Sequence, residues 1–370
     1  MNKNKIKGSL LGLAWGDILG SPVEGWKKPE IQSTYGMYSS LPSEYQGNKI
    51  PVQRLKRLRP LGLHTDDTQQ AMALIHSCLQ QGTWSKGAWK QMLVQGLQQQ
   101  AWRGVGRNFV DAVRRMSRGI PCEQAGSPSS GIGSAMRIGP LGALYSDPKD
   151  VDLLFKATLE SSLITHADQR AAVFSSVIAY TVSLFIQENP RESVLEPLQY
   201  FAKEAEAYVS SLEAEGWKVG NSDSTLISDA IKEAMYWVDE PVRKMRTKIS
   251  ELARPHLQAG FTRAHVNQGF VLLGGLHALL MACRDDMEPQ EILLSMINEG
   301  YDTDTVAAIA GTILGARFGT DWIPTEHFYD RERILDYTDA IVDKKLPETM
   351  GEFIEKEADL TRMEKEFRVG

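Results

Sequence analysis

The sequence predicts one all-α domain, and three observations support this prediction. Apolar residues recur at the 3.6-residue spacing of an α-helix through most of the 370 residues. Short runs that alternate apolar and polar residues, which are typical of β-strands, are almost absent. No linker rich in Pro, Gly or Ser divides the chain, and no repeat of solenoid length is apparent. We therefore expect residues 1–345 to form the domain and residues 346–370 to form a charged, peripheral tail.

The helical pattern starts with a first core helix within residues 1–20, where the apolar run is interrupted by glycines and by Asp17. Further segments with clear periodicity are 67–81, 87–100, 108–116, 151–162, 167–188, 195–215, 226–238, 268–283, 289–298 and 305–318. Three stretches rich in turn-forming residues are expected to be loops, namely 26–63, 119–133 and 216–225.

Composition limits the class of protein. Apolar residues make up 42% and charged residues 24%, which is the profile of an ordinary globular protein. The net charge of −6 argues against a nucleic-acid-binding surface. Cys78, Cys122 and Cys283 lack the spacing of a zinc site and fit a reducing compartment. The longest apolar run, 270–283, is too short to cross a bilayer. We therefore expect a cytoplasmic protein without a nucleic-acid or membrane partner.

Two acidic clusters share one layout, HTDDTQQAMALI at 64–75 and GYDTDTVAAIAG at 300–311. Each sets aspartates among threonines directly before an apolar run. The simplest interpretation is N-capping, in which Asp and Thr oxygens accept hydrogen bonds from backbone N–H groups. A cap needs only one oxygen, however, and each cluster supplies several. Four small residues would let the second helix pack closely against a neighbour, and these are Ala307, Ala308, Gly311 and Gly315.

If the clusters meet, four carboxylates share one small volume: Asp66, Asp67, Asp302 and Asp304. At about 4 Å, each like-charge pair costs roughly 4 kcal/mol at an effective dielectric near 20. Two divalent cations would balance the four negative charges. Because oxygen ligands select hard cations, we expect two Mg²⁺ ions, with Mn²⁺ as the alternative.

Five stretches then carry a family resemblance: GSLLGLAWGDILGSPVEGW, HTDDTQQAM, GIGSAMRIGPLGALY, THADQRAAVFSSVIAY and NEGYDTDTVAAIAGTILGARFG. They extend from about residue 8 to 319, and together the chain resembles the ADP-ribosylglycohydrolase family, of the dinitrogenase-reductase-activating glycohydrolase and ADP-ribosyl-acceptor hydrolase type. The resemblance implies a single-domain orthogonal helical bundle with a binuclear Mg²⁺ cleft. It also implies hydrolysis of the glycosidic bond between ADP-ribose and a modified acceptor, commonly an arginine side chain of a protein.

The resemblance implies six metal ligands, which are Thr65, Asp66, Asp67, Asp302, Asp304 and Thr305. Thr303 falls between ligands and is expected to brace the turn. Glu24 in SPVEGW matches the acidic residue of the family that gates or touches the metal site, and a solvated loop glutamate is the alternative. We hypothesise that the metals orient the ribose and activate a water, whose proton passes to Asp66 or Asp67. The expected catalytic residues are thus Asp66, Asp67 and Glu24.

The stretch SPSSGIGSAMR offers hydroxyls and backbone N–H groups to a diphosphate, at what we interpret as a helix start. The residues expected to bind ADP-ribose here are Ser129, Ser130, Gly131, Gly133 and Ser134, and the resemblance adds His166. Ile132 stands where the family usually has asparagine, which removes a hydrogen-bonding group. Arg137 either faces phosphate or forms a buried ion pair.

Two further stretches bear on the substrate. Residues 267–269 are expected at the adenosine end, whereas Phe270 is expected to pack in the core. Tyr301 and Glu299 differ from the usual neighbours of the second cluster. Tyr301 either narrows the cleft, stacks on substrate or packs internally.

Two other functions compete with the hydrolase. One is a binding protein that neutralises a partner toxin with little turnover, with residues 26–63 and 187–225 available for the contact. The other is a two-metal phosphohydrolase acting on a nucleotide, which leaves GSAMR and THADQR unexplained. Because all six ligand positions are intact, the sequence favours an active hydrolase, with a role in toxin immunity as one possible setting.

Overall fold

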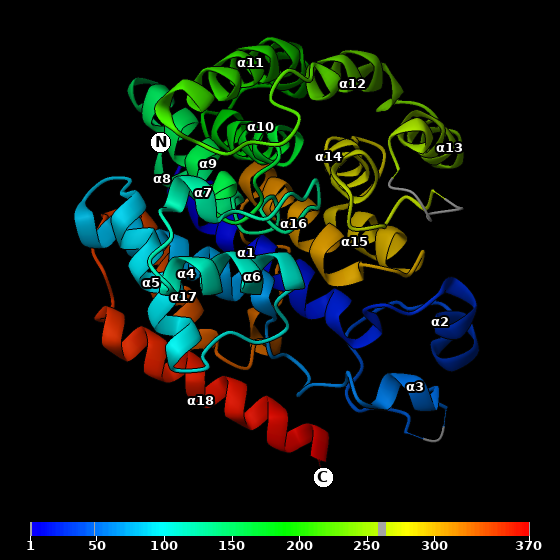
Figure 1. Ribbon diagram of the computed structural model, residues 1–370. Coiled ribbons are helices and arrows are strands. Elements are labelled where there is room, and N and C mark those ends of the chain that lie inside the picture. The colour runs from blue at the N-terminus through cyan, green and yellow to red at the C-terminus, as the bar shows by residue number, and fades with distance from the viewer. Residues whose placement is uncertain (1, 48, 258–263, 370) are drawn as a thin grey trace.

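The computed structural model describes residues 2–47, 49–257 and 264–369. The described residues form helices, turns and isolated bridges but no named strand, so the all-α prediction is confirmed (Figure 1).

Two helices from opposite ends of the sequence pair at the centre, α1 (Lys3–Gly20) and α16 (Thr303–Phe318). Glycines on both helices face each other, because a Cβ added at Gly8, Gly12 or Gly16 would overlap the backbone of α16. The expected close packing of the second acidic segment is therefore confirmed, and its partner is the first core helix.

Other helices enclose this pair, as Figure 1 shows. Those in contact with α1 or α16 are α4 (Asp66–Gln81), α8 (Gly139–Leu144), α10 (Gln169–Ile186), α14 (Leu276–Ala282), α15 (Pro289–Ile297) and α17 (Arg331–Asp343). Farther out lie α5 (Lys86–Gln98), α6 (Arg107–Ser117), α9 (Val151–Leu163), α11 (Arg191–Leu212), α12 (Leu226–Ala234) and α13 (Val242–Ala253). Every segment predicted from periodicity thus contains a helix.

Among the described residues, one helix, α10, is long and apolar enough to cross a membrane. However, 89% of its residues are buried inside the molecule, which is the environment of a core helix. The three cysteines are free and buried, so none of them forms a disulfide.

Two of the three expected loops contain short helices, contrary to the prediction from the sequence. Residues 26–63 include α2 (Lys28–Tyr35) and α3 (Val52–Leu55), and residues 119–133 include α7 (Cys122–Ala125). The segment 268–283 opens with a π-helical turn, Val271–Gly275, before α14 begins. Single 3₁₀ turns occur at Ser21–Val23, Pro148–Asp150, Glu213–Glu215, Met235–Trp237, Arg254–His256 and Thr325–His327.

The expected peripheral tail is largely the helix α18 (Met350–Val369), which lies along the outside of the bundle at the lower edge of Figure 1. Phe353, Ile354, Glu357 and Glu364 on one of its faces are buried. The many charged residues of this segment suggested a solvated tail. Two of its carboxylates, those of Glu357 and Glu364, are instead buried and form ion pairs with arginines, so the segment is a packed helix.

Candidate active site

The packing of α1 against α16 brings the beginnings of α4 and α16 together, and each acidic cluster lies at one of these helix N-termini. The capping interpretation holds for the first cluster, since the Thr65 Oγ1 accepts from the Asp67 N–H at 3.3 Å. In the second cluster Asp302 occupies the N-cap position of α16 without a side-chain capping bond, and the Asp304 Oδ1 instead accepts from the Thr305 N–H at 3.0 Å. Thr303 braces the turn as expected, donating to the Gly20 carbonyl at 2.9 Å.

Asp17 of α1 anchors the first cluster through hydrogen bonds to Thr65 and Thr68. Its buried carboxylate accepts the Thr65 N–H at 2.9 Å and 3.0 Å, the Thr68 N–H at 3.1 Å and the Thr68 hydroxyl at 2.6 Å. A buried carboxylate is costly unless hydrogen bonds satisfy it, and these donors do so. Asp17 therefore fixes the position of the first turn of α4 relative to α1.

The four aspartates are close enough to perturb each other. Burial, the Glu24 carboxylate and Asp17 raise the pKa of Asp66 to about 7, and Arg59 opposes this shift. Burial and Glu24 raise the pKa of Asp302 to about 6. Burial also raises the pKa of Asp67 well above its ordinary value, with Asp17, Asp66 and Asp302 adding to the rise. Burial raises the pKa of Asp304 well above its ordinary value, and the carboxylates of Glu24, Asp67 and Asp302 add to the rise. The two clusters thus interact electrostatically, as the sequence led us to expect.

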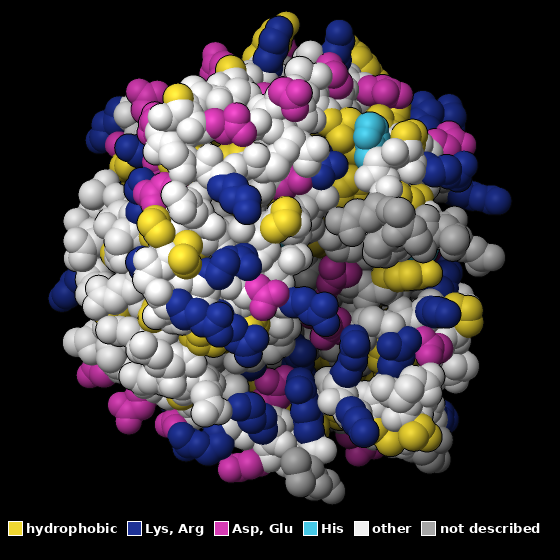
Figure 2. All heavy atoms as spheres, viewed as in Figure 1, with side chains coloured by type: hydrophobic (Ala, Val, Ile, Leu, Met, Phe, Trp, Pro, Cys, Tyr) yellow, Lys and Arg dark blue, Asp and Glu magenta, His cyan; other side chains and the backbone are white. Residues whose placement is uncertain are grey.

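A cavity of about 270 Å³ opens above the clusters. The expected site residues that line it are Glu24, Asp66, Ser129, Gly131, Gly133, His166, Asp302, Asp304 and Thr305. Figure 2 shows acidic side chains within a hollowed part of this face, with Lys and Arg side chains around it. Residues from both ends of the chain and from its middle therefore share one cavity.

Four expected site residues do not line this cavity. Thr65 is buried and donates to the Asp67 Oδ2 at 2.9 Å, so both lie behind the cavity wall. Ser134 is buried and accepts a hydrogen bond from the Ser175 hydroxyl at 3.0 Å, which points it into the core. Ser130 faces the neighbouring cavity instead.

Glu24 is held at the cavity edge by two features. Its Oε2 lies 3.2 Å from the Arg59 Nη2. The next residues bind the second cluster through their backbone, because the Gly25 N–H donates to the Tyr301 carbonyl and the Tyr301 N–H donates to the Trp26 carbonyl, both at 2.6 Å. Tyr301 adopts a φ of 68° and stacks on His265. Of the three roles considered for Tyr301, packing against a neighbouring side chain is the one for which the structure shows a contact.

The serine and glycine loop packs tightly against His166. A Cβ on Gly133 would stand 2.8 Å from the His166 Nε2, so only glycine leaves room for the ring. Burial, and secondarily Arg137, lower the pKa of His166 to about 3, which keeps the imidazole neutral. The expected helix start is absent here, since residues 131–138 form turns and α8 begins at Gly139.

Arg137 lies beneath this loop and is buried. It donates to the Gln70 side-chain oxygen and to the Thr165 hydroxyl, each at 2.6 Å, and to the Ser161 carbonyl at 3.1 Å. These partners are neutral, so the expected buried ion pair is not formed among the described residues, and Arg137 does not line the cavity. Ile132 is also buried, with its Cδ1 facing Gly274.

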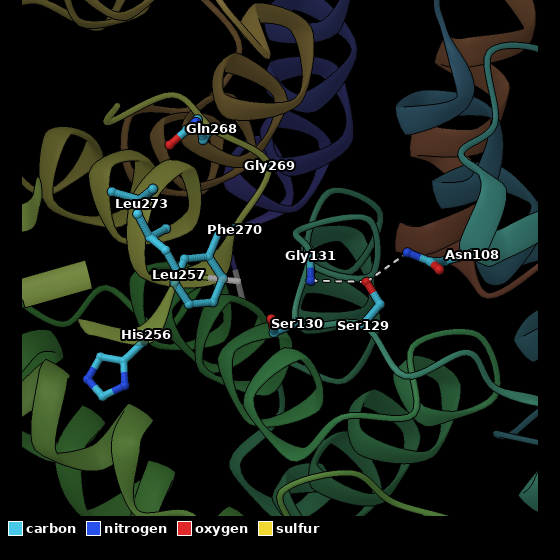
Figure 3. A pocket seen from close by; sticks show the side chains of 10 residues that line it. All are labelled: Asn108, Ser129, Ser130, Gly131, His256, Leu257, Gln268, Gly269, Phe270 and Leu273. Carbon is cyan, nitrogen blue, oxygen red and sulfur yellow. Dashed lines mark hydrogen bonds between the residues drawn. The ribbon is translucent and has the colours of Figure 1, made fainter. Parts of the chain in front are cut away.

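A second cavity of about 220 Å³ shares Asn108, Ser129, Gly131 and Gly269 with the first. In Figure 3, the Ser129 hydroxyl accepts from the Asn108 amide at 3.0 Å and from the Gly131 N–H at 3.2 Å. Gln268, Gly269 and Phe270 line this cavity, so Phe270 is not confined to the core.

Asn267 does not line either cavity. It is buried, and its amide donates to the carbonyls of Met296 at 2.8 Å and Gly300 at 2.9 Å, just before the second cluster. Asn267 therefore supports the cluster rather than an adenosine.

No three His, Cys, Asp or Glu side chains converge to enclose a metal ion in the part of the chain that the structure describes. The binuclear centre therefore stays a prediction. The residues nevertheless fit a hard cation. The Asp67 Oδ1 is buried without a hydrogen-bond partner among the described residues. A Cβ on Gly269 would lie 2.9 Å from the Asp302 Oδ2, and one on Gly104 would lie 2.9 Å from the Asp66 Oδ1. The glycines thus leave space beside the carboxylates.

The sequence analysis missed several residues of this site, chiefly Asp17, Arg59, Gln70 and Asn108. Asp17 gave one signal, since it is the single carboxylate within an otherwise apolar and glycine-rich first helix. Arg59 gave none, because it stands in a basic stretch that reads as a solvated loop.

Comparisons with known proteins point to one family. The family model described as ADP-ribosylglycohydrolase matches residues 2–350. An uncharacterized protein of Archaeoglobus fulgidus is 27% identical over 316 residues, covering 85% of this chain and 88% of that protein. Human ADP-ribosylhydrolase ARH3 is 26% identical over 345 residues, covering 87% of each. A solved structure described as an ADP-ribosylglycohydrolase-related protein complex matches with a TM-score of 0.64 and 23% identity, covering 93% of this chain and 99% of that one. The chain belongs to the ADP-ribosylglycohydrolase family, which hydrolyses ADP-ribose linkages.

Proposed function

We propose that this protein is a Mg²⁺-dependent hydrolase that releases ADP-ribose from a modified acceptor, with ADP-ribosyl-arginine on protein as the first substrate to test. The observation that carries the proposal is the single cavity lined by both acidic clusters and by the serine and glycine loop. A cavity that is lined by carboxylates and also by neutral hydrogen-bond donors suits a ribose held between a reactive centre and a diphosphate.

Asp66, Asp302, Asp304 and Thr305 line the cavity and would hold the metal ions there, with Asp67 and Thr65 behind them. When bound, Mg²⁺ or Mn²⁺ would supply charge neutralisation and Lewis acidity next to the ribose. The donor set is entirely oxygen, which suits a hard cation.

The reaction replaces the bond between the anomeric carbon and the acceptor by a bond to a water oxygen, through an oxocarbenium-like transition state, and the departing acceptor takes up the proton that the water loses. Asp66 is placed to accept the proton of that water, because it lines the cavity in which the ribose would bind. Asp67 is buried behind the wall, which favours Asp66 of the two candidates.

The remaining groups orient the nucleotide. Neutral His166, Gly131 and Ser129 line the same cavity as the aspartates, and diphosphate and ribose oxygens need such hydrogen-bonding groups. The adjoining cavity with Gln268 and Phe270 offers an apolar face for the adenine. Glu24, at the cavity edge, complements the positive charge of a guanidinium acceptor, which is why arginine is the preferred acceptor in this proposal.

The test is an assay of free ADP-ribose after incubation with arginine-, serine- and nucleic-acid-linked ADP-ribose, with Mg²⁺, with Mn²⁺ or with chelator. We expect release that requires the metal and is fastest from arginine. Asp66→Asn and Asp304→Asn should lose at least about a hundredfold in kcat, since each removes a charged group from the reacting centre. Asp321→Asn, at an exposed site, is the matched control.

Metal-independent release, or near-normal turnover by both folded variants, would refute the proposal. Release of phosphate or AMP would instead favour a phosphohydrolase. A toxin partner, a role in immunity and a cytoplasmic location stay predictions. Binding of an ADP-ribosylating toxin that survives Asp66→Asn would identify a neutralising function.

A further inference from the structure

Arg59 is a buried cation at the edge of an acidic cavity, and its side chain is only 4% exposed. Its Nη2 donates to the Glu24 Oε2 at 3.2 Å, and its Nε lies 3.2 Å from the Glu364 Oε1. Burial disfavours its charge, yet Glu24, Glu364 and Asp304 raise its pKa above the ordinary value. Arg59 therefore stays charged and is shared between the active-site cavity and a distant part of the chain.

The last turns of α18 fix Arg59 from the outside. Glu364 is 2% exposed and also binds Arg368, which in turn donates to the Leu58 carbonyl at 3.1 Å. The Tyr45 hydroxyl donates to the Arg59 carbonyl at 2.8 Å, and the Tyr45 ring contacts Phe367. Both the backbone and the guanidinium of Arg59 are thus held by contacts that depend on the C-terminal helix.

A second carboxylate of α18 reaches the first acidic cluster. Glu357 is fully buried and accepts from the Arg103 Nη1 at 2.6 Å and from the Gln69 amide at 2.7 Å. Arg103 also donates to the carbonyl of His64, two residues before Asp66. The same helix is therefore connected to Glu24 through one carboxylate and to the start of α4 through another. The family match ends at residue 350, where α18 begins.

We propose that Arg59 is a positioning residue, which orients Glu24 and sets the affinity of the acidic cavity for divalent cations, and that Glu364 of α18 holds it in place. The inference rests on the proposed function, because it concerns the ions and the glutamate of that same cavity. The negative charge of Glu364 partly offsets the positive charge of Arg59. Arg59 therefore repels a divalent cation at the aspartates less strongly than it would without Glu364.

This arrangement predicts opposite effects for two substitutions. Arg59→Gln removes a cation near the aspartates, so Mg²⁺ should bind about fivefold more tightly. It also frees Glu24, so kcat should fall at least about tenfold with little change in KM. Glu364→Gln leaves Arg59 without its buried counter-charge, so Mg²⁺ should bind about fivefold more weakly. A general loss of packing would weaken binding in both variants.

The experiment is calorimetric titration of purified full-length protein with Mg²⁺ alone, together with steady-state kinetics and thermal unfolding. Glu366→Gln makes the same change at an exposed position of the same helix and should match wild type in all three. Arg59→Lys keeps the charge but cannot contact both glutamates as a guanidinium does. Arg59→Lys should therefore bind Mg²⁺ with wild-type affinity but have a lower kcat. If Arg59→Gln does not fold, Arg59→Lys and Glu364→Gln together still test the inference.

Three results would overturn the inference. First, Arg59→Gln could bind Mg²⁺ no more tightly than wild type does. Second, Glu364→Gln could bind Mg²⁺ with the same affinity as Glu366→Gln. Third, Arg59→Lys, which keeps the charge, could bind Mg²⁺ about fivefold more tightly than wild type, as is expected only for Arg59→Gln. If wild type binds Mg²⁺, any one of these results rejects the role of Arg59 and Glu364 but leaves the proposed metal site standing. A wild-type protein that does not bind Mg²⁺ rejects the proposed metal site and this inference with it.

Discussion

Gly12 of α1 and Gly311 of α16 meet backbone to backbone. A Cβ built on either residue would overlap the carbonyl oxygen of the other, and neither obstacle is a flexible side chain. Because α1 carries Asp17 and α16 begins with the second acidic cluster, this contact sets the distance between the two halves of the cavity.

Gly12→Ala should therefore destabilise the protein by about 2 kcal/mol or more, since two backbones must separate to admit a methyl group. The control is Gly87→Ala, at an exposed helical position where the nearest atom is a flexible serine hydroxyl at 3.7 Å. Alanine should stabilise α5 there by about 0.5 kcal/mol, through its higher helix propensity. Denaturant unfolding measures both changes. Equal stability of the two variants would show that the α1–α16 contact tolerates separation.

Asp17→Asn tests the support beneath the first cluster. Asparagine keeps one acceptor oxygen but presents an NH₂ group to donors from Thr65 and Thr68, so we expect a loss of about 2 kcal/mol. Thr68→Val removes one of those donors, the hydroxyl 2.6 Å from the Asp17 Oδ2. A double-mutant cycle by denaturant unfolding should give a coupling energy of about 1 kcal/mol or more. Additive effects would mean that the short contact contributes nothing.

The fold was accessible from the sequence because its signals are local. Periodicity located the helices, and the paired threonine and aspartate clusters marked the beginnings of α4 and α16. The partners of Asp17, Arg59 and Glu364 were not accessible. Each is a charged residue in a segment where charge is expected in solvent or at a helix break, and burial depends on donors located far away in the chain.

The role of α18 illustrates the same limit. Its sequence contains many more charged than apolar residues, which is typical of a solvated tail. Glu357 could be assigned to the interior only by knowing that Arg103 and Arg333 converge on it. Long-range ion pairs leave no periodic pattern, so they are the part of the site that sequence reasoning does not reach.

Asp66→Asn should change the pH dependence of stability in chelator. The folded-state pKa of Asp66 is raised to about 7, above the ordinary value of about 3.9. The native state therefore binds this proton more tightly than the unfolded state, and Asp66 lowers stability progressively as pH rises from about 4 to about 7. Asparagine carries no charge and removes this loss.

The measurement compares wild type and Asp66→Asn by unfolding in chelator from pH 4 to 8. The comparison cancels the contributions of the buried histidines, whose pKa values are lowered and which act in the opposite direction. The free energy of unfolding of Asp66→Asn relative to wild type should show no pH-dependent gain near pH 4, should increase as the pH rises, and should become constant above about pH 7. A difference that does not depend on pH would contradict the raised pKa.

Gly133→Ala tests the contact between the substrate loop and His166. The new Cβ would stand 2.8 Å from the His166 Nε2, so the ring or the loop must shift. Because both line the cavity, we expect ADP-ribose to bind about tenfold more weakly by calorimetry, while the unfolding midpoint changes little. Gly106→Ala is the control, since Gly106 lines the same cavity but has no atom within 4 Å of its added Cβ, and this variant should bind ADP-ribose as wild type does. If Gly133→Ala also binds normally, then ADP-ribose does not depend on the placement of His166 beside this loop, and the diphosphate must be held elsewhere in the cavity.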